Sequence, residues 1–281
     1  MVAVALGIGT ALCWGLADFL GGIRTRRLTL AAVLAVSQLT GLTAVAVVVV
    51  AGNVEAPAAG DVAPALAAGV CQLAGIAALY RALAIGTMSV ISPISASGAA
   101  AIPVVVGLAT GERPGAVVFL GMAAAFAGVT LASRTPASAA NGAPSRQGLA
   151  LAAVAALGFG GFYVGMDAAV KEAEPFWALL AARASAGVVL VAVLVSLRPK
   201  LGADPANLPS LALIGLLDIS ANVCFTLGTE TGLVSVVAVL ASLYPVGTVL
   251  LAWALLGERL VAVQTAGVAV ALAGVALIAA G

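Results

Sequence analysis

The residues that could carry chemistry in this sequence are ionisable groups inside long apolar stretches. Arg183 and Asp218 lie near the middle of two such stretches, and Asp18 lies near the end of a third. A charge at membrane depth costs about 3 kcal/mol or more, so it is usually paired or functional. Because Arg183 and Asp218 have opposite charges at similar nominal depth, we expect either an ion pair between their helices or a role in solute binding or coupling.

The position of Asp18 leaves two interpretations open. Near a membrane interface it would be hydrated or would meet the basic segment Arg24–Arg27. A role for Asp18 in a binding or coupling site requires that its helix face a central cavity.

Polar and aromatic side chains inside the apolar stretches form a second group of candidates. We expect six of them to line a mostly apolar cavity and to bind the substrate: Trp14, Gln72, Ser95, Tyr163, Asn222 and Tyr244. The alternative for each is a hydrogen bond between neighbouring membrane helices. Trp14 and Tyr244 are the preferred solute contacts, because a large ring offers contact area together with a polar edge.

Catalysis, cofactors and nucleic acid are not expected. The sequence has no histidine, its 11 acidic residues are scattered, and its three cysteines, Cys13, Cys71 and Cys224, lie far apart. It therefore offers no metal-ligand spacing and no nucleophile–base pair, which a membrane-embedded enzyme acting on a lipid-linked substrate would need. It also lacks the Gly-rich nucleotide-binding signature, and its net charge is only +1. We expect no catalytic residues and no bound metal.

Composition assigns the chain to the membrane. Among 281 residues, 63% are hydrophobic and only 8% are charged, against about 25% charged in an average soluble protein. So few charged side chains cannot cover a soluble domain. A bilayer core needs roughly 20 apolar residues per helix, and ten such windows are predicted: residues 2–20, 30–51, 62–82, 87–109, 115–133, 148–168, 175–197, 208–228, 232–256 and 261–280.

An internal repeat divides these spans into five and five. Sliding the sequence by 146 residues aligns Gly111-Glu112-Arg113 with Gly257-Glu258-Arg259, together with several small residues of the fifth and tenth spans. We expect these small residues to pack the two spans closely, and each Glu to lie at the positive N-terminus of the next helix. The predicted fold is all-α and integral to the membrane. It has a first five-helix repeat (residues 1–133), a flexible linker (134–147) and a second five-helix repeat (148–281), which together form one domain.

Because each repeat has an odd number of helices, the two must have inverted topology. Such repeats are typical of secondary transporters, with the site near the bilayer midplane. We expect a cavity bounded by the first, third, fourth, sixth, eighth and ninth spans. Pro93, Pro103 and Pro245 are expected to kink the fourth and ninth of them.

Basic residues near the span ends predict the orientation. One side of the predicted helices carries nine of them: Arg24, Arg26, Arg27, Arg81, Arg134, Arg146, Arg198, Lys200 and Arg259. The other side carries only Arg113 and Lys171. This bias predicts a multi-pass protein of the cell membrane with a cytoplasmic 134–147 linker and both termini extracytoplasmic.

Short motifs resemble one transporter family. Trp14-Gly15, the run Tyr80-Arg81-Ala82-Leu83 and the two Gly-Glu-Arg triplets are similar to those of ten-helix EamA-type members of the drug/metabolite transporter superfamily. The resemblance implies alternating access and export of amino acids or other small metabolites. One departure is Phe159-Gly160, which stands where the first repeat has Trp14-Gly15, with the register slipped by one residue.

The sequence therefore predicts a secondary carrier or facilitator of a small solute that works without a cofactor. Its expected partners are the solute and the lipid bilayer, with protons as a candidate coupling ion, and the chain would act as a monomer or homodimer. Competing hypotheses are a multidrug or cation exporter, the membrane-embedded enzyme, and a scaffold subunit of a larger complex.

Overall fold

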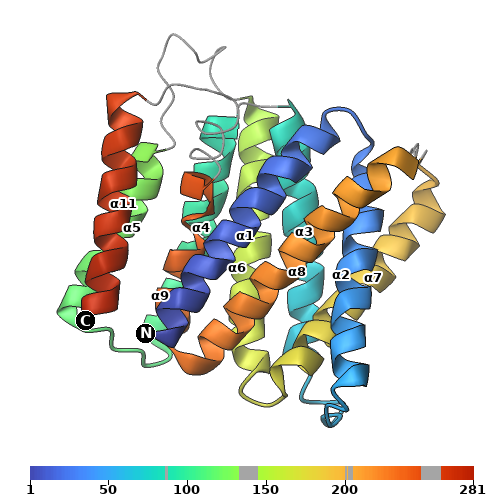
Figure 1. Cartoon of the computed structure of the whole chain (residues 1–281), viewed down its shortest axis with the longest axis horizontal. Helices are drawn as coiled ribbons and strands as arrows, with labels where there is room; N and C mark the ends of the chain where they lie inside the picture. The colour runs from blue at the N-terminus through green and yellow to red at the C-terminus, as the bar shows by residue number, and fades with distance from the viewer. Residues whose placement is uncertain (86–87, 133–144, 200, 202–204, 248–260) are drawn as a thin grey trace.

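The structure is a computed structural model that describes residues 1–85, 88–132, 145–199, 201, 205–247 and 261–281. Within these residues the chain is all-helical and has no strand. Its ten α-helices are α1 (Val2–Thr25), α2 (Leu30–Ala51), α3 (Ala63–Ile85), α4 (Met88–Ala109), α5 (Ala116–Ala132), α6 (Arg146–Ala169), α7 (Pro175–Leu197), α8 (Leu208–Thr231), α9 (Val234–Ala241) and α11 (Ala262–Ala280) (Figure 1). A short 3-10 helix, Pro205–Asn207, precedes α8.

Seven of these helices are long and apolar enough to cross a membrane, and three shorter apolar helices accompany them in the described part of the chain. Many large apolar side chains face outward, as a protein surrounded by lipid tails requires. Examples more than half exposed are Leu12, Val50, Val105, Val188 and Leu197. The predicted all-helical membrane architecture is therefore confirmed.

The predicted spans agree closely with the helices. The second and seventh have the predicted bounds, Leu30–Ala51 and Pro175–Leu197, whereas α8 runs three residues beyond its predicted end at residue 228. Thr29 and Glu174 begin these two helices, because their side-chain oxygens accept hydrogen bonds from first-turn amides. The linker at 134–144, the end of the ninth span and the second Gly-Glu-Arg triplet lie outside the described residues.

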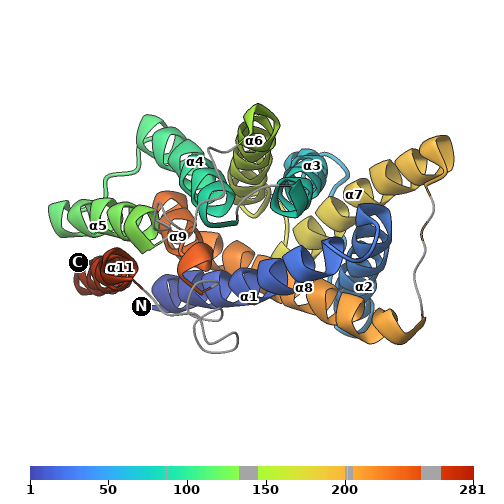
Figure 2. The same cartoon turned by 90° about the horizontal axis from the view of Figure 1, so that it is seen from above.

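Helix packing places the two halves of the chain against each other. α3 packs on α6 and α7, while α8 packs on α1 and α2. α4 contacts α6 and α9, and α1 contacts α9 as well as α8. Seen from above, α2 and α7 lie at one edge of the molecule and the α5–α11 pair at the other (Figure 2).

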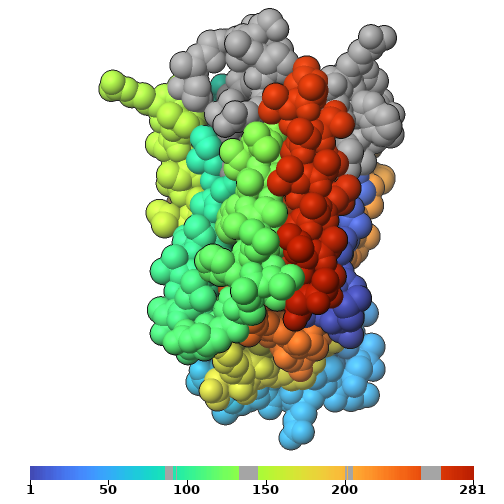
Figure 3. Space-filling view, turned by 90° about the vertical axis from the view of Figure 1, so that its left-hand side faces the viewer, coloured from blue at the N-terminus to red at the C-terminus, as the bar shows by residue number. Residues whose placement is uncertain are grey.

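Small residues bring α5 and α11 together, as predicted. A methyl group at Gly121 would lie 2.8 Å from the Gly274 carbonyl oxygen and from the Ile278 amide nitrogen. Such close approach of backbones is possible only without a side chain. The two helices run side by side on an outer face of the molecule (Figure 3).

The ninth span is interrupted in its middle. α9 ends at Ala241, Ser242 and Leu243 form a turn, and a further helical turn covers Tyr244 to Gly247. Pro245 explains the break, because it has no amide hydrogen to donate to the Ala241 carbonyl. The irregularity predicted for this span is present and precedes Tyr244, whereas α4 stays helical through Pro103.

The Gly111-Glu112-Arg113 turn corrects one prediction. Glu112 does not cap the next helix, α5. Its carboxylate instead accepts hydrogen bonds from the Val234 and Ser235 amides at the start of α9. The sequence alone could not reveal this contact, because it joins residues more than 120 positions apart.

Candidate functional site

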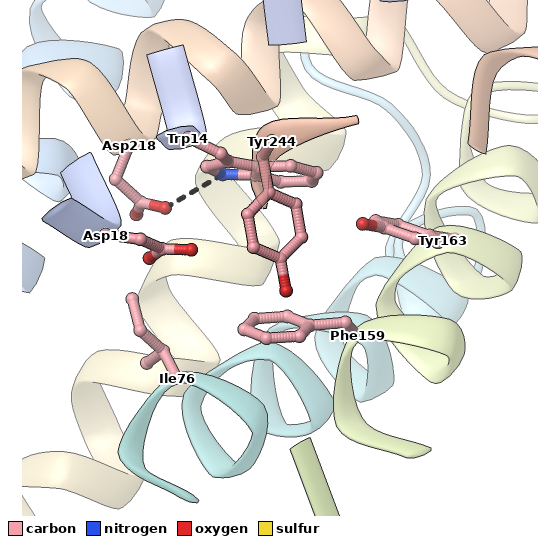
Figure 4. A pocket seen from close by; sticks show the side chains of 7 residues that line it. All are labelled: Trp14, Asp18, Ile76, Phe159, Tyr163, Asp218 and Tyr244. Atoms are coloured by element: carbon pink, nitrogen blue, oxygen red, sulfur yellow. Dashed lines mark hydrogen bonds between the residues drawn. The ribbon is translucent and has the colours of Figure 1, made fainter. Parts of the chain in front are cut away.

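A central pocket lies between helices from both halves of the chain. It has an empty volume of about 250 Å³, which includes the open space at its mouth. Its walls are Trp14 and Asp18 of α1, Ile76 of α3, Phe159 and Tyr163 of α6, Asp218 of α8, and Tyr244 after the break in the ninth span (Figure 4).

A buried charged network forms one side of this pocket. Arg183 Nη2 donates to Asp218 Oδ2 at 2.5 Å, and Arg183 Nη1 donates to Gln38 Oε1 at 2.7 Å. The second Asp218 oxygen accepts a hydrogen bond from Trp14 Nε1 at 3.1 Å. Arg183 and Asp218 are only 2% and 3% exposed, so the predicted ion pair is confirmed as a buried contact. The network joins α1, α2, α7 and α8.

Arg183 lies behind Asp218 and is not one of the pocket-lining residues. Its guanidinium already donates to a carboxylate and to an amide oxygen. The alternative in which Arg183 binds a solute carboxylate therefore has no support in this arrangement.

Asp18 faces the pocket rather than an interface. It is 9% exposed, and within the described residues it has neither an ion pair nor a hydrogen bond. The basic segment that follows is engaged elsewhere, with Arg24 donating to Asn207 Oδ1. Asp18 thus brings a carboxylate into an apolar site beside the already paired Asp218 (Figure 4).

A cluster of aromatic rings lies against the pocket and contributes Trp14 and Tyr163 to its walls. Tyr163 stacks on Trp14 with ring centroids 5.6 Å apart and on Phe225 at 4.6 Å. Phe162 meets Trp14 edge-on at 6.3 Å. Such stacking gives an apolar surface suited to flat or cationic groups.

Three of the six predicted binding residues line the pocket: Trp14, Tyr163 and Tyr244. The other three are buried in contacts between helices. Gln72 Nε2 donates to Asn222 Oδ1 at 2.9 Å, and Ser95 donates to the Ala152 carbonyl. These are the interhelical hydrogen bonds that the alternative interpretation expected.

Two lining residues, Ile76 and Phe159, were not predicted. Phe159 could have been found, because it is the residue that stands in place of Trp14 in the second half. Ile76 carries no sequence signal, since an aliphatic side chain is expected at any position of a membrane span. Within the described residues there is no group of three or more His, Cys, Asp or Glu side chains that could hold a metal ion.

Comparison with known proteins shows which family this architecture resembles. Residues 146–280 match the EamA-like transporter family. Over these residues the chain is similar to an EamA-like transporter domain. The resemblance inferred from the sequence is thereby confirmed for this half, and the EamA family is part of the drug/metabolite transporter superfamily.

The whole chain is similar to a solved structure titled "Crystal structure of protein". The TM-score is 0.76 at 17% sequence identity, over 98% of this chain and 95% of that one. At this identity the likeness shows the fold alone, but it covers the first half as well as the EamA-like half. A search of curated proteins gave no match.

We predict that the buried ion pair makes a large contribution to stability. Arg183→Gln leaves the Asp218 carboxylate buried and uncompensated, so it should lower the free energy of unfolding in detergent by about 3–5 kcal/mol. Combining it with Asp218→Asn should recover part of that loss.

The pair Lys171–Asp167 is the control, because the Lys171 side chain is 64% exposed. Lys171→Gln should cost less than about 1 kcal/mol. A double-mutant cycle that gave no coupling energy between Arg183 and Asp218 would contradict the prediction.

Proposed function

We propose that this chain is a secondary carrier or facilitator that exports small metabolites, such as amino acids, by alternating access. The observation that carries the proposal is the central pocket, which helices of both halves enclose and in which the carboxylates of Asp18 and the paired Asp218 lie among aromatic rings. Pockets at such a meeting of repeats are the usual solute sites of secondary transporters. The description of the family that the second half matches, a transporter family, is in keeping with this role.

The packing pattern supports two inverted five-helix repeats, residues 1–133 and 148–281, joined by a 134–147 linker. In such a repeat α1 corresponds to α6, α2 to α7, α3 to α8 and α4 to α9. If each helix is exchanged for its counterpart, the contacts of α3 with α6 and α7 become the contacts of α8 with α1 and α2. All of these contacts are present. The same exchange turns α4–α6 into α9–α1, which is also present.

The pocket residues follow the same relation. Trp14 and Asp18 stand four residues apart on α1, and Phe159 and Tyr163 stand four apart on α6, with a constant shift of 145 residues. The equivalence of α1 and α6, which the one-residue slip had weakened, is supported by their shared use of these positions.

The pocket charges favour a solute with an amino group. Arg183 is engaged by Asp218 and Gln38, so a solute carboxylate would find no cation among the lining residues. Asp18 can accept an ammonium group, and the rings around it can accept its alkyl or aromatic part. A proton could occupy the same carboxylate when the solute leaves, which makes protons the candidate coupling ion.

A cation exporter of the same class is the second candidate function. The observation that favours it is Asp18 within reach of the rings of Trp14, Tyr163 and Tyr244. A carboxylate with aromatic faces recognises organic cations that have no carboxylate of their own.

Flux in proteoliposomes tests the proposal. Counterflow is measured for a panel of amino acids, amines and quaternary ammonium compounds, with and without a pH gradient. Trp14→Ala and Tyr244→Ala should each reduce flux of the accepted solute about tenfold or more, because a buried aromatic contact is removed.

Phe119→Ala is the matched control, since this ring is 52% exposed on the outer surface of α5. It should leave flux unchanged. Asp18→Asn should abolish the effect of the pH gradient and the transport of cations. Wild-type flux and affinity in both pocket variants would overturn the site, and no flux with any member of the panel would count against the function.

We propose in addition that both termini are extracytoplasmic and that residues 134–147 are cytoplasmic, from the bias of basic residues. In a variant without native cysteines, Asn53→Cys in the α2–α3 turn should react with an impermeant thiol reagent added to intact cells. Gln147→Cys should react only after the cells are opened. Both positions are exposed, and the reverse labelling pattern would invert the orientation.

A further inference from the structure

Glu112 makes a contact that neither the pocket nor the helix packing explains. Its two carboxylate oxygens accept hydrogen bonds from Val234 N at 2.8 Å and Ser235 N at 3.3 Å. α9 has no cap of its own, because the preceding residue is Leu233 and makes no side-chain cap hydrogen bond. The first turn of a second-half helix is therefore held by a carboxylate of the first half. A negative charge at a helix N-terminus is favourable through both the hydrogen bonds and the helix dipole.

The whole Gly-Glu-Arg turn is built for this contact. Gly111 has φ +108°, a conformation that side chains rarely adopt. Gly107 leaves space for the carboxylate, since a methyl there would lie 2.6 Å from Glu112 Cδ. Arg113 donates to the Leu108 and Glu112 carbonyls and so fixes the turn at the end of α4. Each residue of the triplet thus has a role in presenting Glu112 to α9.

A second, independent observation lies on α8. Asp218, Asn222, Thr226 and Thr229 follow one face of this helix and are all buried; we call them the α8 polar stripe. It leads from the pocket, at Asp218, towards the end of α8 that connects to α9. Within the described residues, Asn222 Nδ2 and Thr226 Oγ1 have no hydrogen-bond partner, nor has Ser235 Oγ at the start of α9.

Buried polar atoms without partners are rare, and each needs a reason. The three atoms on α8 and α9 lie between the pocket and one end of the molecule. Their lack of partners is explained if water or solute contacts them in another conformation of the protein. Figure 1 shows the α4–α5 connection and the α8–α9 turn at this same end, together with both chain termini. α9 packs on both α1 and α8, so movement of its first turn would change the cover over the stripe.

We propose that the α8 polar stripe is the closed half of the solute pathway and that Glu112 is the latch that keeps it closed. The inference rests on the proposed transport function and adds to it a gate and a path. When Glu112 releases α9, the first turns of that helix move away and the stripe becomes hydrated from the end that carries the termini.

Accessibility of single cysteines tests the latch without a known solute. In a background without native cysteines, Thr226→Cys reports on the stripe and Ile76→Cys on the pocket. Each is labelled with an impermeant thiol reagent from either side of the membrane, in right-side-out and inside-out vesicles. Glu112→Gln should raise labelling of both reporters from the side of the termini by about fivefold, as expected for loss of a helix cap. Labelling of Ile76→Cys from the opposite side should fall.

Glu230→Gln is the matched control, because Glu230 is an exposed acid at the same end of the molecule. It should change neither reporter. Unchanged labelling in Glu112→Gln would overturn the latch, and so would an equal rise from both sides, which indicates loosened structure. A rise at Ile76→Cys alone would overturn the path along the stripe. If Ile76→Cys in the parent background reacts from neither side, the proposed transport function fails instead.

Discussion

The buried ion pair between Arg183 and Asp218 is the interaction on which the rest of the structure depends. Two charges at this depth are tolerated only when each compensates the other and their remaining hydrogen-bonding positions are filled. Gln38 and Trp14 supply those partners, so four helices from both halves meet at one point. Since Trp14 also forms a wall of the pocket, the electrostatic requirement of the core sets the geometry of the site.

This network divides the pocket into a fixed and a movable side. On the fixed side, movement of α1, α2, α7 or α8 would expose a charge to an apolar surrounding. On the other side, α6 contributes rings held by stacking, and the ninth span is broken at Ser242–Leu243 and tethered through Glu112. Stacked rings can slide at small cost, and a broken helix can bend. A transport cycle that keeps the ion pair intact would therefore move α6, α9 and their neighbours against α1 and α8.

The sequence was sufficient to predict the features that depend on the length of apolar segments and on the charge and depth of single residues. Apolar windows gave the helices, in two cases with their final bounds, and opposite charges at equal depth predicted the ion pair. It could not separate Tyr163, which lines the pocket, from Asn222, which bonds to Gln72, because polar residues in a span look alike until the helices are packed. Ile76 has no signal, because an aliphatic side chain is expected at any position of a membrane span. The contact of Glu112 with α9 depends on which helix start lies beside the turn, and only the folded structure decides that.

Distances between spin labels at the two ends of the helices test alternating access most directly. One pair, Glu230→Cys and Lys171→Cys, reports on the end with the termini, and a second, Arg26→Cys and Gln147→Cys, reports on the opposite end; all four positions are exposed. Measured by double electron–electron resonance in liposomes, each pair should show two distance populations. Addition of a transported solute, or a change of pH, should lengthen one pair while it shortens the other. A single unchanged distance at both ends, or lengthening of both together, would contradict the account.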